Sequence, residues 1–133
     1  GASLVHACEW NPEAIEALRW GLESNGVDRR CVVHEGDSRV TSQSLEETAD
    51  RVFLGLLPSS EDGLEAALRV LKPDGGTLHI HGLAPSSDHF SWAEGVVASA
   101  SAIRPYSCVR TGLVRVKSYA PHWDHVVLDI SLA

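Results

Sequence analysis

Short apolar segments alternate along this chain with segments of helical periodicity, and this alternation constrains the fold more than any other feature. The predicted strands cover residues 3–8, 31–34, 50–58, 77–82, 112–121 and 125–130, and the predicted helices cover residues 12–25, 64–71 and 92–104. Strands and helices that alternate through short turns are typical of an α/β doubly wound sheet. Residues 50–58, DRVFLGLLP, are almost continuously apolar, which predicts a strand buried on both faces in a parallel sheet.

The first predicted helix carries start and stop signals. Asn11 offers an N-cap, Pro12 occupies the first helical position, and Ile15, Leu18 and Leu22 follow at helical spacing until Asn25 and Gly26. This helix therefore begins three residues after Glu9, the residue that ends the first apolar strand.

Two acidic residues follow consecutive predicted strands. Glu9 ends the first strand, and Asp37 lies in EGDSR after the second. Because the carboxyl ends of parallel strands meet at one edge of the sheet, Glu9 could hold ribose hydroxyls and Asp37 could accept from an adenine amino group. Each acid also has a structural interpretation: Glu9 as an acid favoured near a helix N-terminus, and Asp37 as part of an Asx-type turn.

The stretch LGLLPSS ends the most apolar strand with Pro58 and two serines. In a parallel α/β sheet this position would face the reactive end of a cofactor or a target base. A proline at the end of a strand is also an ordinary turn former.

Charge and cysteine content limit the partners. The formal net charge of −7 makes the chain as a whole repel nucleic acid, but Arg104, Arg110, Arg115 and Lys117 concentrate positive charge near the C-terminal end. Three widely spaced cysteines without a C-x-x-C pair favour free thiols in a reducing compartment. Since no segment has membrane-spanning or signal-peptide character, we expect a soluble cytoplasmic protein without a membrane partner.

The sequence leaves open whether the histidines bind a metal and whether the tryptophans stack on bases. His79 and His81 share a strand face, and His122 and His125 lie three residues apart, yet no ligand set with metal spacing accompanies them, so we expect no metal. The four tryptophans could stack on bases or serve as core and surface anchors; they are Trp10, Trp20, Trp92 and Trp123. Hydrolase and nucleotide-phosphate motifs are missing from the sequence.

Five stretches resemble one known family, in order and nearly end to end. They are HACEWNPEAIEALRWGLESNGV, HEGDSR, ADRVFLGLLPSSEDG, VLKPDGGTLHIHG and VKSYAPHWDHVVLDI. They are similar to the C-terminal catalytic domain of the tRNA wybutosine-synthesizing protein 2 family, whose members use S-adenosylmethionine. The resemblance implies a class I methyltransferase (Rossmann-like) fold, with a mostly parallel sheet and an antiparallel C-terminal strand.

The resemblance also implies a reaction. Family members transfer the 3-amino-3-carboxypropyl group of S-adenosylmethionine to a wyosine-type guanosine next to the anticodon of phenylalanine tRNA. By the same resemblance Glu9 holds the ribose and Asp37 with Ser38 contacts the adenine, although family members commonly have Asn at the position of Ser38. No general base is assigned, because a sulfonium is already activated and the enzyme mainly orients it.

Further residues follow from these expectations. Leu56, Leu57 and Pro58 are candidates to shape the pocket around the reacting end. Arg110, Arg115 and Lys117 could contact tRNA phosphates, or could be solvated strand charges. We expect residues 1–133 to act as a monomer and as one truncated S-adenosylmethionine-binding transferase domain.

The chain departs from the family at its start. It begins at GASLVHACEW, which in the family follows the first strand and its glycine-rich loop, so the resemblance leads us to expect that this chain lacks both. That strand is central in the fold, and its loss would leave two sheet edges unpaired. Three hypotheses result: an aminocarboxypropyl transferase seen as a fragment, a tRNA guanine-N1 methyltransferase, or a catalytically inactive binding module.

Overall fold

The computed structural model describes residues 1–104 and 107–133. The chain forms two compact units, Gly1–Ser44 and Leu45–Ala133. In chain order the helices and strands are β1 (Val5–Glu9), α1 (Pro12–Ser24), β2 (Cys31–Glu35), α2 (Ser38–Thr41), β3 (Arg51–Leu54), α3 (Leu64–Val70), β4 (Gly76–Pro85), α4 (His89–Ile103), β5 (Cys108–Ala120) and β6 (Trp123–Leu132). Single 3₁₀ turns lie at Asp28–Arg30, Ser42–Leu45 and Glu61–Gly63.

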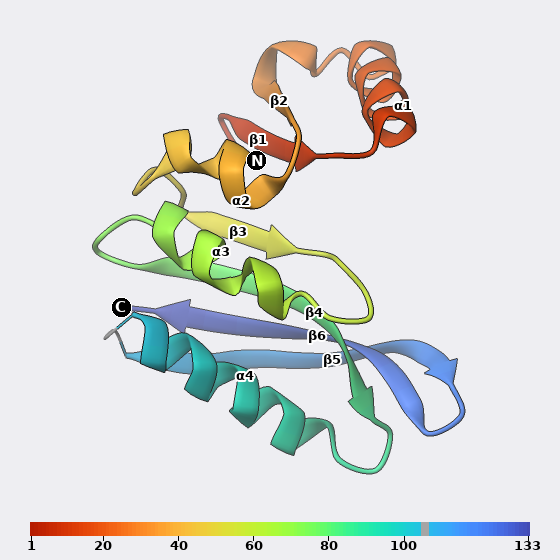
Figure 1. Ribbon diagram of the computed structural model, residues 1–133, viewed down its shortest axis with the longest axis vertical. Coiled ribbons are helices and arrows are strands. Elements are labelled where there is room, and N and C mark those ends of the chain that lie inside the picture. Colours follow the sequence, from red (N-terminus) through yellow and green to blue (C-terminus); the bar gives the residue numbers. More distant parts are fainter. Residues whose placement is uncertain (105–106) are drawn as a thin grey trace. The chain divides into compact units, whose positions relative to one another are not determined.

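The first unit is a strand–helix–strand motif. β1 pairs in parallel with β2, from Val5 opposite Cys31 to Glu9 opposite Glu35, and α1 connects the two strands (Figure 1). The side chain of Asn11 accepts from the backbone N–H of Glu13 at 3.0 Å, which confirms the predicted N-cap of α1. The one-turn helix α2 follows β2 where the sequence suggested only a turn.

The second unit is a four-stranded sheet in the order β3-β4-β6-β5. β3 is parallel to β4, while β6 lies antiparallel to both β4 and β5. This arrangement confirms the prediction of parallel pairing followed by an antiparallel C-terminal strand. The loop predicted for residues 84–92 is shorter than expected, because Asp88 accepts from the backbone N–H of Ser91 at 3.0 Å and starts α4 at His89.

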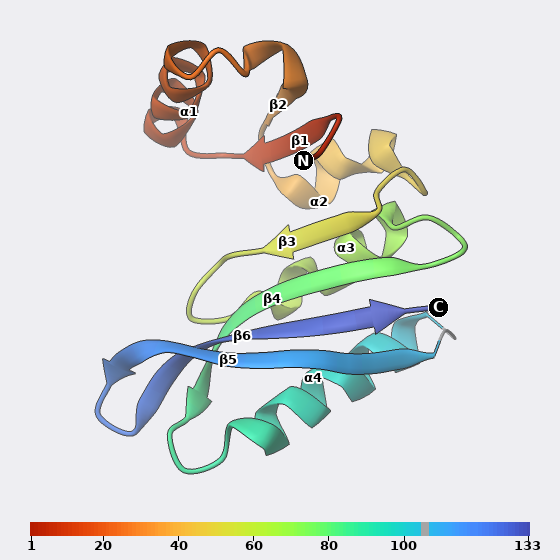
Figure 2. The same ribbon diagram turned by 180° about the vertical axis from the view of Figure 1, so that it is seen from behind.

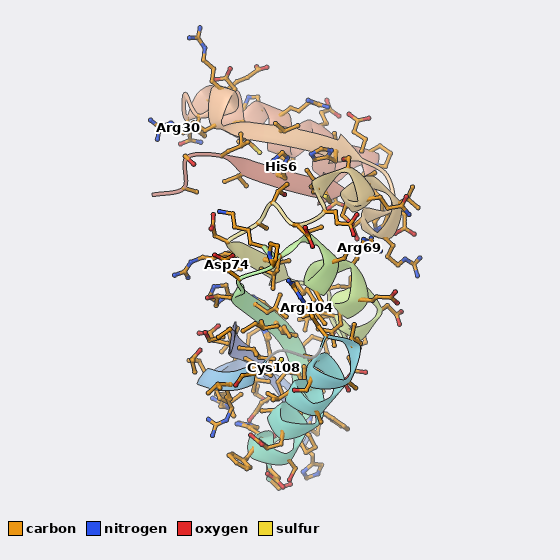
Figure 3. All side chains as sticks on the ribbon, turned by 90° about the vertical axis from the view of Figure 1, so that its left-hand side faces the viewer. His6, Arg30, Arg69, Asp74, Arg104 and Cys108 are labelled. Atoms are coloured by element: carbon orange, nitrogen blue, oxygen red, sulfur yellow. The ribbon has the colours of Figure 1, made fainter. Side chains whose placement is uncertain are left out.

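Helices α3 and α4 cover one face of the four-stranded sheet, as the two opposite views show (Figures 1 and 2). Leu78 and Ile80 of β4 and Leu128 and Ile130 of β6 alternate toward these helices and are at most 2% exposed. Arg104, labelled in Figure 3, caps the end of α3 by donating to the carbonyl oxygens of Leu68, Leu71 and Lys72 at 2.6, 3.2 and 2.8 Å.

The strand at residues 51–54 corrects one prediction. We expected burial on both faces of the segment 50–58, but β3 ends at Leu54 and Phe53 is 68% exposed. The reason is that α3 and α4 pack on one face only, so side chains that alternate to the other face stay exposed. Among the described residues β1 pairs only with β2, and β3 pairs only with β4.

Candidate functional site

Glu9 occupies the end of β1 with one carboxylate oxygen engaged. Its Oε1 accepts from the backbone N–H groups of Trp10 and Asn11, both at 2.9 Å. Its Oε2 has no hydrogen bond within the described part of the chain. A carboxylate offers about four acceptor positions, so Oε2 retains two for a ligand. The turn thus fixes the carboxylate while leaving it able to accept two hydroxyl groups.

Asp37 caps α2 and pairs with a nearby arginine. Its Oδ1 accepts from the backbone N–H of Arg39 at 2.9 Å, and its Oδ2 accepts from Nη2 of the same residue at 2.7 Å. The hydrogen bond from the side chain of Arg39 and, second to it, the one from the backbone of Arg39 lower the pKa of Asp37 to about 2. Asp37 is therefore ionised at neutral pH, with both oxygens engaged by Arg39. Ser38, the first residue of α2, lies beside it and is exposed.

An open pocket of about 540 Å³ lies in the first unit, next to the end of β2. Trp10 and Pro12, together with Ile15, Glu16 and Arg19 of α1, line it opposite Glu35 and Gly36. Arg19 donates to Glu35 at 2.7 Å across this pocket wall. Trp10 is 71% exposed, so its ring is free to stack on a ligand.

The loop after β3 is held by one buried hydroxyl. Ser60 is 4% exposed, and its Oγ donates to the carbonyl oxygen of Leu56 at 2.8 Å. The same Oγ lies 3.1 Å from the carbonyl oxygen of Leu54 and 3.0 Å from that of His81. Ser60 thereby ties the stretch LGLLPSS to β4, which fixes the position of Pro58.

Pro58, one of the three residues predicted to shape a pocket, lines an open pocket in the second unit. This pocket of about 350 Å³ is also lined by Leu83, Tyr119, Ala120 and Trp123. Leu56 is 65% exposed and lies outside that lining, as does Leu57. That all three shape the pocket around the reacting end stays a prediction.

The three predicted phosphate contacts differ in their surroundings. Nε of Arg110 lies 3.4 Å from Oε1 of Glu94, and Nε of Arg115 donates to Oδ2 of Asp124 at 3.0 Å. The hydrogen bond from Arg115 is the main cause that lowers the pKa of Asp124. Lys117, in contrast, is exposed and has no side-chain partner in residues 1–104 and 107–133. Lys117 is therefore the most available of the three cations.

Two of the histidines considered in the sequence, His79 and His81, contact another side chain. Nδ1 of His79 lies 2.6 Å from Oδ1 of Asp129, and Nδ1 of His81 lies 2.9 Å from Nε2 of His125. Burial and, after it, electrostatic interaction with His125 and His79 lower the pKa of His81. Within residues 1–104 and 107–133, no group of three potential ligands could hold a metal ion. None of the described helices combines the length and apolar character needed to cross a membrane.

The four tryptophans, whose role the sequence left open, have different surroundings in the structure. Trp10 and Trp123 line the two pockets, whereas Trp92 packs against the core of the second unit. Trp20 is 73% exposed and lines neither pocket. The sequence held one signal for Trp10, its place directly after Glu9. Tyr119 was not recognised, because Pro58 and Leu83, which line the same pocket, lie far from it in the sequence.

Comparison with known sequences identifies a matching family. The family of TRM5/TYW2 methyltransferase domains matches residues 1–101. The tRNA wybutosine-synthesizing protein 2/3/4 of Arabidopsis thaliana is 46% identical to this chain over 134 residues. That match covers 97% of this chain and 13% of the plant protein, so the chain spans only a small part of this relative.

Two archaeal structures are similar to this one. TYW2 from M. jannaschii, solved in complex with AdoMet, superimposes with a TM-score of 0.88 at 25% identity, covering 98% of this chain and 57% of that one. TYW2 from P. horikoshii, solved in complex with MeSAdo, gives a TM-score of 0.87 at 26% identity, covering 97% and 48%. These similarities confirm the predicted α/β fold of the class I methyltransferases.

Proposed function

Because this chain belongs to the family of TRM5/TYW2 methyltransferase domains, we propose that it is the S-adenosylmethionine-binding part of a tRNA-modifying transferase. The reaction is transfer of the 3-amino-3-carboxypropyl group to a wyosine-type guanosine, a step of wybutosine biosynthesis. One observation carries the choice of group: a TYW2 structure holds MeSAdo, which is what AdoMet becomes when its aminocarboxypropyl group leaves. Methyl transfer would leave adenosylhomocysteine instead.

The first unit supplies donors and acceptors that fit the adenosine part of S-adenosylmethionine. Oε2 of Glu9 accepts from the two ribose hydroxyls, since the backbone of Trp10 and Asn11 holds the carboxylate in place. The exposed ring of Trp10 stacks on the adenine. Asp37 and Ser38 contact the adenine amino group, which requires the side chain of Arg39 to release one Asp37 oxygen.

The chemistry demands orientation more than proton transfer. S-Adenosylmethionine brings a sulfonium that already activates each carbon bonded to it. The contribution of the chain is to hold one of these carbons in line with the acceptor. Leu56, Leu57 and Pro58 shape the pocket at the reacting end, and we assign no residue of this chain as a general base.

The same proposal covers the acceptor base, the oligomeric state and the cellular compartment. The acceptor is the base next to the anticodon of phenylalanine tRNA, with Lys117, and after it Arg110 and Arg115, contacting phosphates. Residues 1–133 act as one monomeric transferase domain in the cytoplasm, without a metal ion. The three free cysteines, Cys8, Cys31 and Cys108, suit this reducing compartment.

Product analysis tests the function directly. The chain is incubated with phenylalanine tRNA carrying the precursor base and with S-adenosylmethionine labelled in either the methyl or the aminocarboxypropyl group. We expect aminocarboxypropyl label in tRNA and release of methylthioadenosine, and a Glu9→Gln variant should show the same product at reduced rate. Methyl label in tRNA with adenosylhomocysteine would support the guanine-N1 methyltransferase. No turnover by a folded chain would support the inactive binding module.

A further inference from the structure

The pocket lined by Pro58, Leu83, Tyr119, Ala120 and Trp123 has the character of a binding site for a flat group. Its volume of about 350 Å³ falls in the range of roughly 300–1,000 Å³ that small-molecule sites occupy. Its lining consists of apolar and aromatic side chains, which offer flat surfaces and few hydrogen-bonding partners. Such a lining favours the face of an aromatic ring over a charged or extended group.

The pocket lies where parallel α/β sheets bind ligands. Pro58 follows the carboxyl end of β3, and Leu83 lies near the carboxyl end of the parallel neighbour β4. The backbone N–H of Leu83 donates to the carbonyl oxygen of Pro58 at 3.2 Å, so the two residues form one continuous wall. Ligands of doubly wound folds bind beyond the carboxyl ends of the strands. The opposite wall is the hairpin between β5 and β6.

The hairpin presents two aromatic rings at this wall. Tyr119 near the end of β5 is 52% exposed, and Trp123 at the start of β6 is 45% exposed. Trp123 is paired with Ala120 across the hairpin, which brings the aromatic residues to the same end of the two strands. Both rings can therefore receive a base without first breaking core packing.

A free cation lies on the same strand face. Lys117 is opposite His125 in the β5–β6 register, and His125 is two residues from Trp123, so the three side chains share a face of the sheet. Lys117 has no partner in the described residues and can meet a phosphate. An aromatic pocket beside a free lysine is the combination that single-stranded nucleic acids use, with bases on rings and phosphate on a cation.

We propose that Tyr119 and Trp123 hold the acceptor base of the tRNA against Pro58. The identity of that base as a wyosine-type guanosine rests on the proposed function. The two aromatic residues position the base by stacking on its faces and take no part in bond formation. They select for a flat tricyclic base, because a wider ring system covers more of both aromatic faces.

Base-dependent binding tests this inference. The probe is an anticodon stem-loop RNA carrying the wyosine-type base, and its control is the same RNA with an abasic site; affinity is measured by fluorescence anisotropy. Trp123→Ala and Tyr119→Ala should each weaken binding of the base-containing RNA about five- to one-hundred-fold. Trp123→Phe should restore most of the affinity. Binding of the abasic RNA should be the same for all variants, and Trp20→Ala serves as the exposed-tryptophan control.

The outcomes separate this inference from the proposed function. Equal affinity of the wild-type chain for the two RNAs, or equal losses for the base-containing and abasic RNAs, would overturn the inference. Methylthioadenosine release after S-adenosylmethionine is added to the same samples would then leave the function standing. Conversely, base-dependent binding that is lost in both alanine variants supports the pocket even if no product forms, in which case only the proposed function falls. Thermal unfolding of each variant verifies folding, and Tyr119→Ala and Trp123→Phe remain informative if Trp123→Ala does not fold.

Discussion

Substitution of Glu9 by glutamine separates the ligand role of this residue from its role in the turn. In the structure Oε1 receives two backbone N–H groups at 2.9 Å, while Oε2 is available to a ligand. The amide oxygen of glutamine can keep both backbone hydrogen bonds, so the turn survives. The amide nitrogen replaces Oε2 and cannot accept from the ribose hydroxyls. Hydrogen bonds to charged groups contribute about 1.5–3 kcal/mol, so we expect S-adenosylmethionine to bind roughly ten- to one-hundred-fold more weakly.

Calorimetric titration of S-adenosylmethionine into the wild-type chain and the Glu9→Gln variant measures this difference. Thermal unfolding of both proteins should give nearly the same midpoint, because the hydrogen bonds of the turn are kept. Glu9→Ala should lose binding and also stability, by about 1–2 kcal/mol, since two backbone N–H groups lose their acceptor. Unchanged affinity of Glu9→Gln would refute the ribose assignment. A large loss of stability in Glu9→Gln would show that the charge matters to the fold and not to a ligand.

Three further predictions concern stability. Leu128→Ala, in the fully buried core, should lower the free energy of unfolding in urea by about 2–5 kcal/mol, whereas Val114→Ala at an exposed strand position should change it by less than about 1 kcal/mol. Ser60→Ala should cost about 1–2 kcal/mol in the same assay, because carbonyl oxygens buried around Oγ lose their donor; no loss would show that water replaces the hydroxyl. The lowered pKa of His81 means that the folded chain binds this proton less readily than the unfolded chain does. The contribution of neutral His81 to the free energy of unfolding is therefore complete above pH 6.5 and is lost as the pH falls below that value. The His81→Asn variant should consequently show a smaller decline in stability between pH 7 and 5 than the wild-type chain.

Local signals in the sequence were sufficient for much of the fold. Asn11 and Pro12 predicted the start of α1, and the structure has the cap hydrogen bond at that position. The alternation of apolar strands and helices predicted an α/β fold with a mostly parallel sheet, and in the structure β1 is parallel to β2 and β3 is parallel to β4. The family resemblance was also confirmed, because the matching family covers residues 1–101.

The errors arose where distant segments decide the outcome. The apolar run at residues 50–58 gives the same pattern whether one or both faces are covered, so the exposure of Phe53 could not be predicted. The pocket at the β5–β6 hairpin requires Pro58 and Trp123 to meet, which depends on strand register across 65 positions of sequence. The early start of α4 is different, since Asp88 is a preferred N-cap residue type and was visible in the sequence.

The two acids that end consecutive strands were equivalent in the sequence, and the structure makes them different. Glu9 is held by backbone N–H groups through one oxygen and keeps the other available, so a ligand can bind without displacing any side chain. Asp37 uses both oxygens on Arg39 and also caps α2, so a ligand must compete with an ion pair. Replacing Asp37 by alanine would therefore confuse loss of a contact with loss of a cap. Asp37→Asn, which keeps a capping oxygen, is the substitution that can test its contact with adenine.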